Sequence, residues 1–186
     1  MAGSRITGGE LRGRVVRAPA GAGSGFRPTS ARVREALFNI VGARVRGARF
    51  ADLYAGTGIV GLEALSRGAR EVVFVEEQRA LARSIVEHCA QMGFGEVTTV
   101  ITGRLAAALR RLPGAFDVVF MDPPYGDGLA EETLAATRAH VAASALVVYE
   151  HSSRYNPPER PAGLRLVDRR VYGDSALGLY QTSEGA

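Results

Sequence analysis

The feature that most constrains the fold is a regular alternation of short apolar runs and helical segments, which begins near residue 49. Runs such as "EVVFVEE" and "FDVVFMD" have the length and β-branched content of strands, and the segments between them carry apolar residues at helical spacing. Strands that are apolar throughout are buried on both faces, which requires helices on both sides of a parallel sheet. The sequence therefore predicts an α/β fold with an open, mostly parallel sheet.

Both ends of the chain depart from this alternation. "RITGGELRGRVVRAP" has short alternating pieces around glycines, which predict a small N-terminal β-hairpin. "LRLVDRRVYGDSALGLYQ" predicts two strands joined by a tight turn at Gly173-Asp174, which would add an antiparallel edge to the sheet. We therefore expect a hairpin or basic arm over residues 1–26 and one α/β domain over residues 27–186.

Charge is distributed unevenly along the chain. All 23 basic residues are arginines. Residues 1–50 hold ten of them with two glutamates, a net charge of +8, whereas residues 51–186 hold 13 arginines and 17 acids, a net charge of −4. A basic arm on a mildly acidic body favours a polyanionic partner, most plausibly nucleic acid. A solvated basic surface is the alternative, and charge alone leaves both open.

The sequence gives no sign of a membrane segment or a metal site. It has no uninterrupted apolar run long enough to span a bilayer, and its N-terminus lacks the apolar core of a signal peptide. Cys89 is the single cysteine, so an internal disulfide is excluded. The three histidines, His88, His140 and His151, do not have metal-ligand spacing. We expect a cytoplasmic protein without a metal.

A glycine-rich turn follows the first strand of the alternation. "DLYAGTGIVG", which begins at Asp52, has the spacing G-x-G-x-x-G at Gly56, Gly58 and Gly61. Glycines let the backbone approach a ligand closely, and ligands of such sheets bind outside the carboxyl ends of the strands. Glu76 ends the next strand, 24 residues beyond Asp52. Its carboxylate could accept hydrogen bonds from both vicinal hydroxyls of a ribose.

Asp52 discriminates between two cofactors that carry a ribose. An acid directly before the glycine turn would face the pyrophosphate of a nicotinamide dinucleotide unfavourably, but it would suit a ligand with ammonium and sulfonium cations. S-adenosylmethionine carries both cations and a ribose, so we expect it at this turn. The alternative roles are a turn cap for Asp52 and a solvated strand end for Glu76.

"DPPY" ends another predicted strand at the same edge of the sheet. The exocyclic amine of a base is a poor nucleophile because its lone pair is delocalised, and two acceptors, the Asp122 carboxylate and the Pro123 carbonyl, could hold it. Pro123 and Pro124 stiffen the turn that orients these acceptors, and Tyr125 offers a ring for base stacking. The segment predicts methyl transfer to a planar nitrogenous substrate, with a proline-rich strand terminator as the alternative.

Several segments together resemble one family. "FRPTSARVREALFNIV", "DLYAGTGIVGLEALSRGA", "VVFVEE", "FDVVFMDPPY", "YGDSAL" and the N-terminal hairpin are similar to the RsmD family over about residues 5–180. The resemblance implies a Rossmann-like class I methyltransferase fold with a seven-stranded sheet. It also implies methyl transfer from S-adenosylmethionine to the N2 amino group of guanine 966 in 16S ribosomal RNA, either naked or in an assembling 30S subunit.

The resemblance implies roles for individual residues. The catalytic set is Asp122, Pro123, Pro124 and Tyr125, and the cofactor-binding set is Asp52, Tyr54, Ala55, Gly56, Gly58 and Glu76. The arginines expected to engage RNA are Arg12, Arg14, Arg27, Arg32 and Arg34. Gly103-Arg104 depart from the acid or amide that many class I enzymes use for adenine, so we expect backbone groups to recognise adenine. A monomer is expected.

Two other functions stay open. A DNA amino-methyltransferase would use the same Asp-Pro-Pro-aromatic turn, although no separate target-recognition domain is visible in 186 residues. A non-catalytic nucleic-acid-binding module would keep the basic arm, but the intact Asp52, Glu76 and Asp122 argue against a decayed site. Cofactor binding separates these classes, because a pure binding module should not bind S-adenosylmethionine.

Overall fold

A computed structural model describes residues 3–20, 29–112, 114–124 and 129–182. The helices are α1 (Ala31–Val41), α2 (Ile59–Ser66), α3 (Arg79–Gln91), α4 (Leu105–Leu109) and α5 (Leu129–Thr137), with short 3₁₀ turns at Gly42–Val45, Gly95–Val97 and Arg138–His140. The strands are β1 (Ser4–Arg5), β2 (Val15–Val16), β3 (Arg49–Leu53), β4 (Glu71–Glu76), β5 (Thr98–Thr102), β6 (Phe116–Met121), β7 (Val141–Ser152), β8 (Leu164–Tyr172) and β9 (Ser175–Thr182). None of the helices in these ranges is long and apolar enough to cross a membrane.

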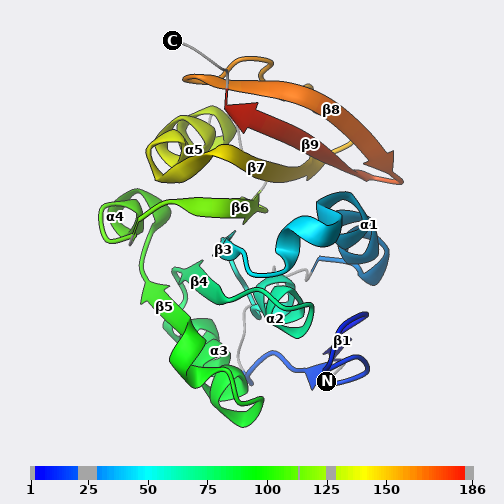
Figure 1. Ribbon diagram of the computed structural model, residues 1–186, viewed down its shortest axis with the longest axis vertical. Coiled ribbons are helices and arrows are strands. Elements are labelled where there is room, and N and C mark those ends of the chain that lie inside the picture. The colour runs from blue at the N-terminus through cyan, green and yellow to red at the C-terminus, as the bar shows by residue number, and fades with distance from the viewer. Residues whose placement is uncertain (1–2, 21–28, 113, 125–128, 183–186) are drawn as a thin grey trace.

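Seven strands form one sheet in the spatial order β5-β4-β3-β6-β7-β9-β8 (Figure 1). Strands β3 to β7 pair in parallel, and β9 lies antiparallel between β7 and β8. This confirms the predicted α/β fold, the seven-stranded sheet and its antiparallel C-terminal hairpin. The strand order reverses between β3 and β6, and ligands of such sheets bind at the carboxyl ends of the strands beside this reversal.

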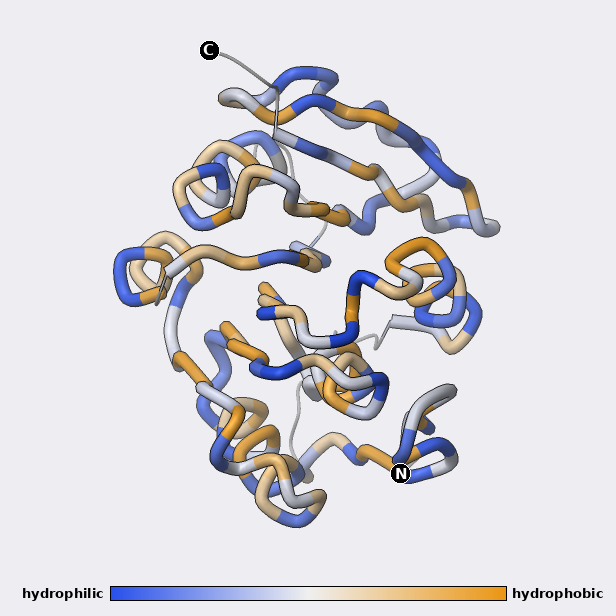
Figure 2. Tube along the Cα trace, viewed as in Figure 1, coloured by the Kyte–Doolittle hydropathy of each residue, from blue (hydrophilic) through white to orange (hydrophobic). Residues whose placement is uncertain are grey.

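Helices cover both faces of the sheet. One core layer lies beneath α1, α2 and α3, where Leu37, Leu62 and Ile85 pack on Phe50 and Phe74 of the strands. The opposite layer lies beneath α4 and α5 and includes alternate residues of the same strands, such as Ala51 and Val73. Because successive strand residues point to opposite faces, apolar runs fill both layers at once. Figure 2 shows the resulting band of apolar residues along the central strands.

The N-terminal hairpin is present and docks on α2. Strands β1 and β2 pair antiparallel, as predicted, and we call the described residues 3–20 the N-terminal arm. Ser66 at the end of α2 binds the arm twice, since its hydroxyl accepts a hydrogen bond from the Leu11 N–H at 2.9 Å and donates to the Gly8 carbonyl at 2.8 Å. Gly9 lies so close to this helix end that an added Cβ would be 1.9 Å from the Ser66 carbonyl oxygen, so only glycine fits.

A buried ion cluster joins the arm to the two nearest helices. The Glu63 carboxylate is fully buried and accepts hydrogen bonds from the Thr7 N–H at 3.2 Å, Arg34 Nε at 3.4 Å and Arg67 Nη2 at 2.7 Å. Arg34 also donates to the carbonyl of Arg5 at 2.7 Å. Buried charges persist when they are paired and hydrogen-bonded, and here the pairing fixes the arm, α1 and α2 to one another.

Candidate active site

Four acids lie along the carboxyl edge of the sheet, on four neighbouring strands. Glu76 ends β4, Asp52 lies in β3, Asp122 directly follows β6, and Glu150 lies near the end of β7. Side-chain alternation along each strand places all four on the face that α1, α2 and α3 cover. Asp52 and Glu76 belong to the cofactor half that the sequence predicts, and Asp122 belongs to the predicted substrate half. The fold therefore brings the two predicted halves together.

The glycine turn between β3 and α2 is held by two of these acids. The Gly56 N–H donates to Glu76 Oε2 at 2.7 Å, and the Gly61 N–H donates to Asp52 Oδ2 at 2.9 Å. Gly56 has a φ of 56°, which favours glycine. Gly61 has no room for a side chain, because an added Cβ would lie 2.2 Å from the Phe74 ring. The turn is therefore shaped before any ligand binds.

Asp52 and Glu76 differ in their burial and in the hydrogen bonds that their carboxyl groups accept. Asp52 is 1% exposed and caps the first turn of α2, and burial raises the pKa of its carboxyl well above the ordinary value. Glu76 accepts backbone N–H groups on both oxygens, from Gly56 and from Gln78 at 2.8 Å. Burial also raises the pKa of Glu76, an effect that these N–H groups partly offset. A carboxylate has about four lone-pair sites, so Glu76 retains acceptor capacity for ribose hydroxyls.

Tyr54 and Ala55 are the next residues of the turn, and both have contacts that hold them in place. Tyr54 has a φ of 65°, a conformation that costs a non-glycine residue energy and is concentrated at functional sites. Its hydroxyl lies 2.9 Å from Thr133 of α5, so the side chain is engaged with the opposite layer. The Ala55 N–H donates to the carbonyl of Val75 at 2.9 Å.

Thr57 provides a test of whether this turn fits a polar ligand. Thr57 belongs to the glycine turn and is 4% exposed. Among the residues that the structure describes, its hydroxyl has no hydrogen-bond partner. A buried hydroxyl without a partner is costly, and a ligand carboxylate or hydroxyl would satisfy it. An unpartnered hydroxyl beside the glycine turn fits a polar ligand such as S-adenosylmethionine, and the sequence analysis did not single out Thr57.

The substrate half centres on Asp122. Thr29, which precedes α1, donates a hydrogen bond from its hydroxyl to Asp122 Oδ2 at 3.5 Å. Burial, with a further contribution from the charge of Glu150, raises the pKa of Asp122 to about 8. Pro123 is buried and Pro124 is exposed. Tyr125, which we predicted as a stacking platform, lies outside the described residues.

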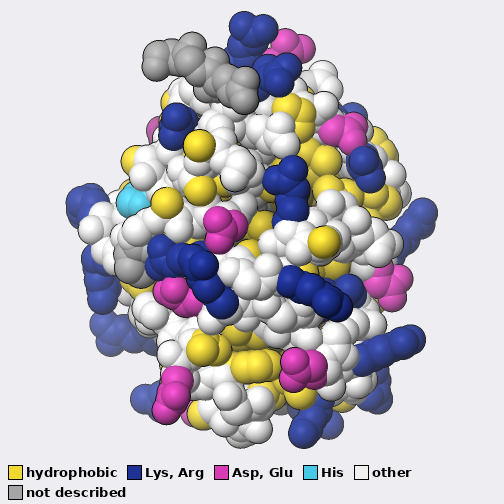
Figure 3. Space-filling view, in the orientation of Figure 1, with side chains coloured by type: hydrophobic (Ala, Val, Ile, Leu, Met, Phe, Trp, Pro, Cys, Tyr) yellow, Lys and Arg dark blue, Asp and Glu magenta, His cyan; other side chains and the backbone are white. Residues whose placement is uncertain are grey.

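The predicted RNA-binding arginines fall into two groups. Arg12, Arg14 and Arg32 are exposed, and Figure 3 shows arginines spread over one whole face and around its outline. Arg34 does not fit the expectation of a phosphate contact, because it is 2% exposed and its guanidinium is bonded to Glu63 and to the carbonyls of Thr29 and Arg5. Helical spacing alone could not separate the buried Arg34 from its exposed neighbours. Arg27 lies outside the described residues.

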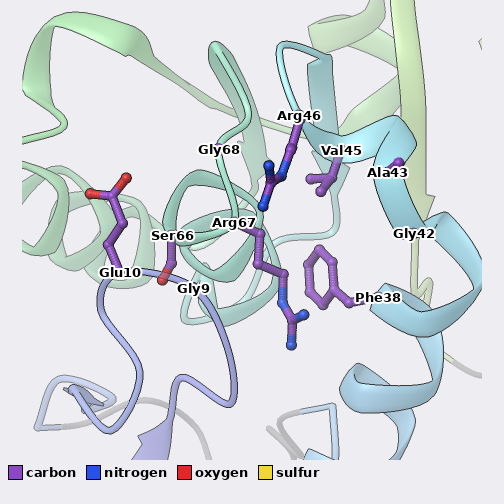
Figure 4. A pocket seen from close by; sticks show the side chains of 10 residues that line it. All are labelled: Gly9, Glu10, Phe38, Gly42, Ala43, Val45, Arg46, Ser66, Arg67 and Gly68. Carbon is purple, nitrogen blue, oxygen red and sulfur yellow. The ribbon is translucent and has the colours of Figure 1, made fainter.

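One hollow in the described structure lies away from this edge. It encloses about 950 Å³ between the arm, the end of α1 and the end of α2, at the opposite end of α2 from the glycine turn (Figure 4). The Arg67 guanidinium lies 4.7 Å from the centre of the Phe38 ring within it. None of the predicted catalytic or cofactor-binding residues lines this hollow, so its size does not mark the site of chemistry.

The chemical groups at the edge are carboxylates, hydroxyls and backbone amides. The described ranges hold no cluster of three or more histidine, cysteine, aspartate or glutamate side chains placed to bind an ion. Cys89 is buried in the core, and burial raises the pKa of its thiol to about 11, which makes it an inert core residue. Carboxylates, hydroxyls and amides can position a ligand and accept protons, which suits transfer of a group that is already activated.

Comparisons with known proteins agree on one family for this chain. A family model described as "Conserved hypothetical protein 95" matches residues 4–181. "Ribosomal RNA small subunit methyltransferase D" of Escherichia coli is 36% identical over 179 residues, which cover 95% of this chain and 89% of that protein. The protein of the same name from Haemophilus influenzae is 30% identical and covers 95% of this chain and 93% of its own length.

Solved structures agree with these relatives. The Escherichia coli protein yhhF, described provisionally as a methyltransferase, superposes with a TM-score of 0.85 at 32% identity over 97% of this chain and 98% of its own. A Thermus thermophilus protein described as hypothetical superposes with a TM-score of 0.79 at 35% identity, covering 96% of this chain and 99% of its own. The more distant SMU.776, solved in complex with SAH, shares the fold at 11% identity with a TM-score of 0.65, covering 81% of this chain and 48% of its own.

Proposed function

This chain belongs to the RsmD family, and we propose that it is a ribosomal RNA methyltransferase that transfers a methyl group from S-adenosylmethionine to the N2 amino group of guanine 966 in 16S RNA. The observation that carries the proposal is the adjacency of the two halves of the site. Leu53 of β3 pairs with Met121 of β6, so the glycine turn and Asp122 emerge side by side. The names of the relatives support ribosomal RNA of the small subunit as the substrate.

The cofactor half would hold S-adenosylmethionine through the backbone of Tyr54 to Gly58, the Glu76 carboxylate and the Thr57 hydroxyl. Glu76 would accept hydrogen bonds from the ribose, while it keeps its bond to the Gly56 N–H. Asp52 would act mainly by fixing the start of α2. A cationic ligand would favour the charged form of its carboxyl, which burial otherwise disfavours. S-adenosylmethionine, when bound, supplies a methyl group that its sulfonium has already activated.

The substrate half would hold the guanine by its amino group. Asp122 would accept one amino hydrogen and the Pro123 carbonyl the other, which orients the nitrogen and opposes delocalisation of its lone pair. Asp122 would then take the proton that the nitrogen gives up, a role that suits a carboxyl group whose pKa lies near 8. The rigid Pro123-Pro124 turn maintains this geometry, and Tyr125 is proposed to stack on the base.

RNA engagement is proposed for the basic arm of residues 1–26, with the remaining residues 27–186 as the methyltransferase domain. The exposed Arg12, Arg14 and Arg32 are the proposed phosphate contacts, together with Arg27. The substrate is 16S RNA or an assembling 30S subunit, which places the protein in the cytoplasm, and we propose that it acts as a monomer.

The experiment that tests this function uses S-adenosylmethionine labelled on its methyl group, with 30S subunits and naked 16S RNA from cells that lack the protein. The transferred label is counted, and the RNA is digested to identify the modified nucleoside. N2-methylguanosine at one position supports the proposal. Label on duplex DNA and none on RNA would instead support a DNA amino-methyltransferase, and an absence of cofactor binding would support a non-catalytic module.

A further inference from the structure

Glu150 is a buried acid beside the proposed catalytic acid, and the proposed mechanism does not use it. Its side chain is 5% exposed. Met121 of β6 pairs with Tyr149 of β7, so the next residues, Asp122 just beyond β6 and Glu150 near the end of β7, lie at the same level of two neighbouring parallel strands. Neighbouring strands lie about 4.8 Å apart, and the two side chains share the face that α1 covers. The two carboxyl groups therefore stand side by side at the substrate half.

Two electrostatic effects support this placement. The charge of Glu150 contributes to the raised pKa of Asp122, and it also acts on the guanidinium of Arg34, which is itself buried. Glu150 thus lies in the interior between the substrate half and the Glu63 cluster. Two buried carboxyl groups in proximity disfavour each other's charged forms, an arrangement that is concentrated at functional sites.

The hydrogen-bonding edge of guanine carries donors that complement two neighbouring carboxylate acceptors. Its N2 amino group and its neighbouring N1–H are both donors, so this edge presents two donors in a row. Adenine and cytosine present an amino donor next to a ring nitrogen that accepts. An ionised carboxylate only accepts hydrogen bonds, so a second carboxylate beside the first would bind guanine and repel the ring lone pair of the other two bases. Enzymes that modify bases commonly read this edge.

We propose that Glu150 selects the base, with its carboxylate accepting the N1–H of guanine while Asp122 accepts the N2 amino group. This inference depends on the proposed function, and it adds an explanation of why the enzyme would select guanine over other bases. Glu150 is a specificity residue in this scheme, because it touches the base at an atom that does not react. The amino group and N1–H are adjacent in the ring, as Asp122 and Glu150 are adjacent in the sheet.

The test replaces the target guanine with 2-aminopurine in a 16S RNA assembled by ligation. 2-Aminopurine keeps the amino group, but its N1 is an acceptor without hydrogen. Wild-type protein should methylate guanine at least tenfold faster than 2-aminopurine, on the order of what a lost hydrogen-bonding partner costs. Glu150→Gln should reduce this preference at least about tenfold, because the glutamine amide can donate to an acceptor at N1.

Several outcomes would overturn the inference. A wild-type preference close to one would do so without any variant, and so would a Glu150→Gln protein that slows both substrates by the same factor. Glu63→Gln is the matched control, since Glu63 is equally buried but lies in the cluster that binds the arm; it should leave the ratio of the two rates unchanged. If wild-type protein does not methylate guanine-containing RNA at all, the proposed function fails instead, and the two failures remain distinct.

Discussion

The two halves of the carboxyl edge are built differently. In the cofactor half, Glu76 and Asp52 accept backbone N–H groups at 2.7 and 2.9 Å, and these bonds tie both acids to the glycine turn. In the substrate half, the Asp122 carboxylate accepts a hydrogen bond from the Thr29 hydroxyl at 3.5 Å. The cofactor half is thus held by backbone hydrogen bonds before a ligand arrives, whereas the Asp122 carboxylate keeps acceptor capacity for a base. Preorganised groups position a cofactor, and available acceptors select a substrate.

The largest effect is expected for Asp122→Ala. Loss of the acceptor and of the proton-accepting carboxylate should reduce single-turnover methylation by about 10²- to 10⁴-fold. Affinity for S-adenosylmethionine, measured by calorimetry, should change little, because Asp122 belongs to the other half. Asp122→Asn is the control that keeps an acceptor oxygen and the size of the side chain. A joint loss of cofactor binding and turnover would contradict the separation of the two halves.

Glu76→Ala should reduce cofactor affinity, whereas Asp122→Ala reduces turnover, and its effect should be somewhat smaller. Removal of an acidic hydrogen-bonding partner should weaken S-adenosylmethionine binding by about 1–3 kcal/mol, measured by calorimetry. Glu77→Ala is a matched control, because this neighbouring acid is 62% exposed. Equal affinities for the two variants would place the ribose contact elsewhere.

The pH dependence of the reaction tests the acid of the substrate half. The pKa of Asp122 is about 8, well above its ordinary value of 3.8, and the carboxylate is the form that accepts hydrogen bonds. The carboxylate becomes populated as the pH rises, so kcat/KM should increase about tenfold per pH unit below 8 and level off above it. Asp122→Asn should abolish this dependence. A flat profile of the wild-type protein between pH 6 and 8 would show that Asp122 is already ionised.

The smallest effect is expected for a double Arg12→Ala and Arg14→Ala variant. Each lost phosphate contact should reduce the slope of log affinity against log salt by about 0.7–0.9, with a moderate loss of RNA affinity. Arg110→Ala with Arg111→Ala is the control, since both arginines are exposed but lie at the end of α4. Equal slopes for the two double variants would mean that the arm does not contact RNA more than the rest of the surface does.

The sequence was sufficient for features that depend on local pattern. The mostly parallel sheet follows from the apolar runs, and the glycine turn, Glu76 and Asp122 follow from their places at strand ends. Contacts between distant segments could not be predicted in this way. Thr29 reaches Asp122 across 93 positions, and Arg34 meets Glu63 across 29. Glu150 carried a similar signal that the sequence analysis did not use, because it lies near the carboxyl end of a strand of the same parallel series.

The docking of the arm on α2 also sets an order of events during folding. The arm precedes its partners in the chain, since the Ser66 hydroxyl that holds Leu11 is 55 positions further along and the Glu63 carboxylate that holds Thr7 is 56. Until α2 has formed, Glu63 has no buried place to occupy and the arm has nothing to dock on. The arm can therefore reach its native position only after α2, which follows it in the chain, has formed.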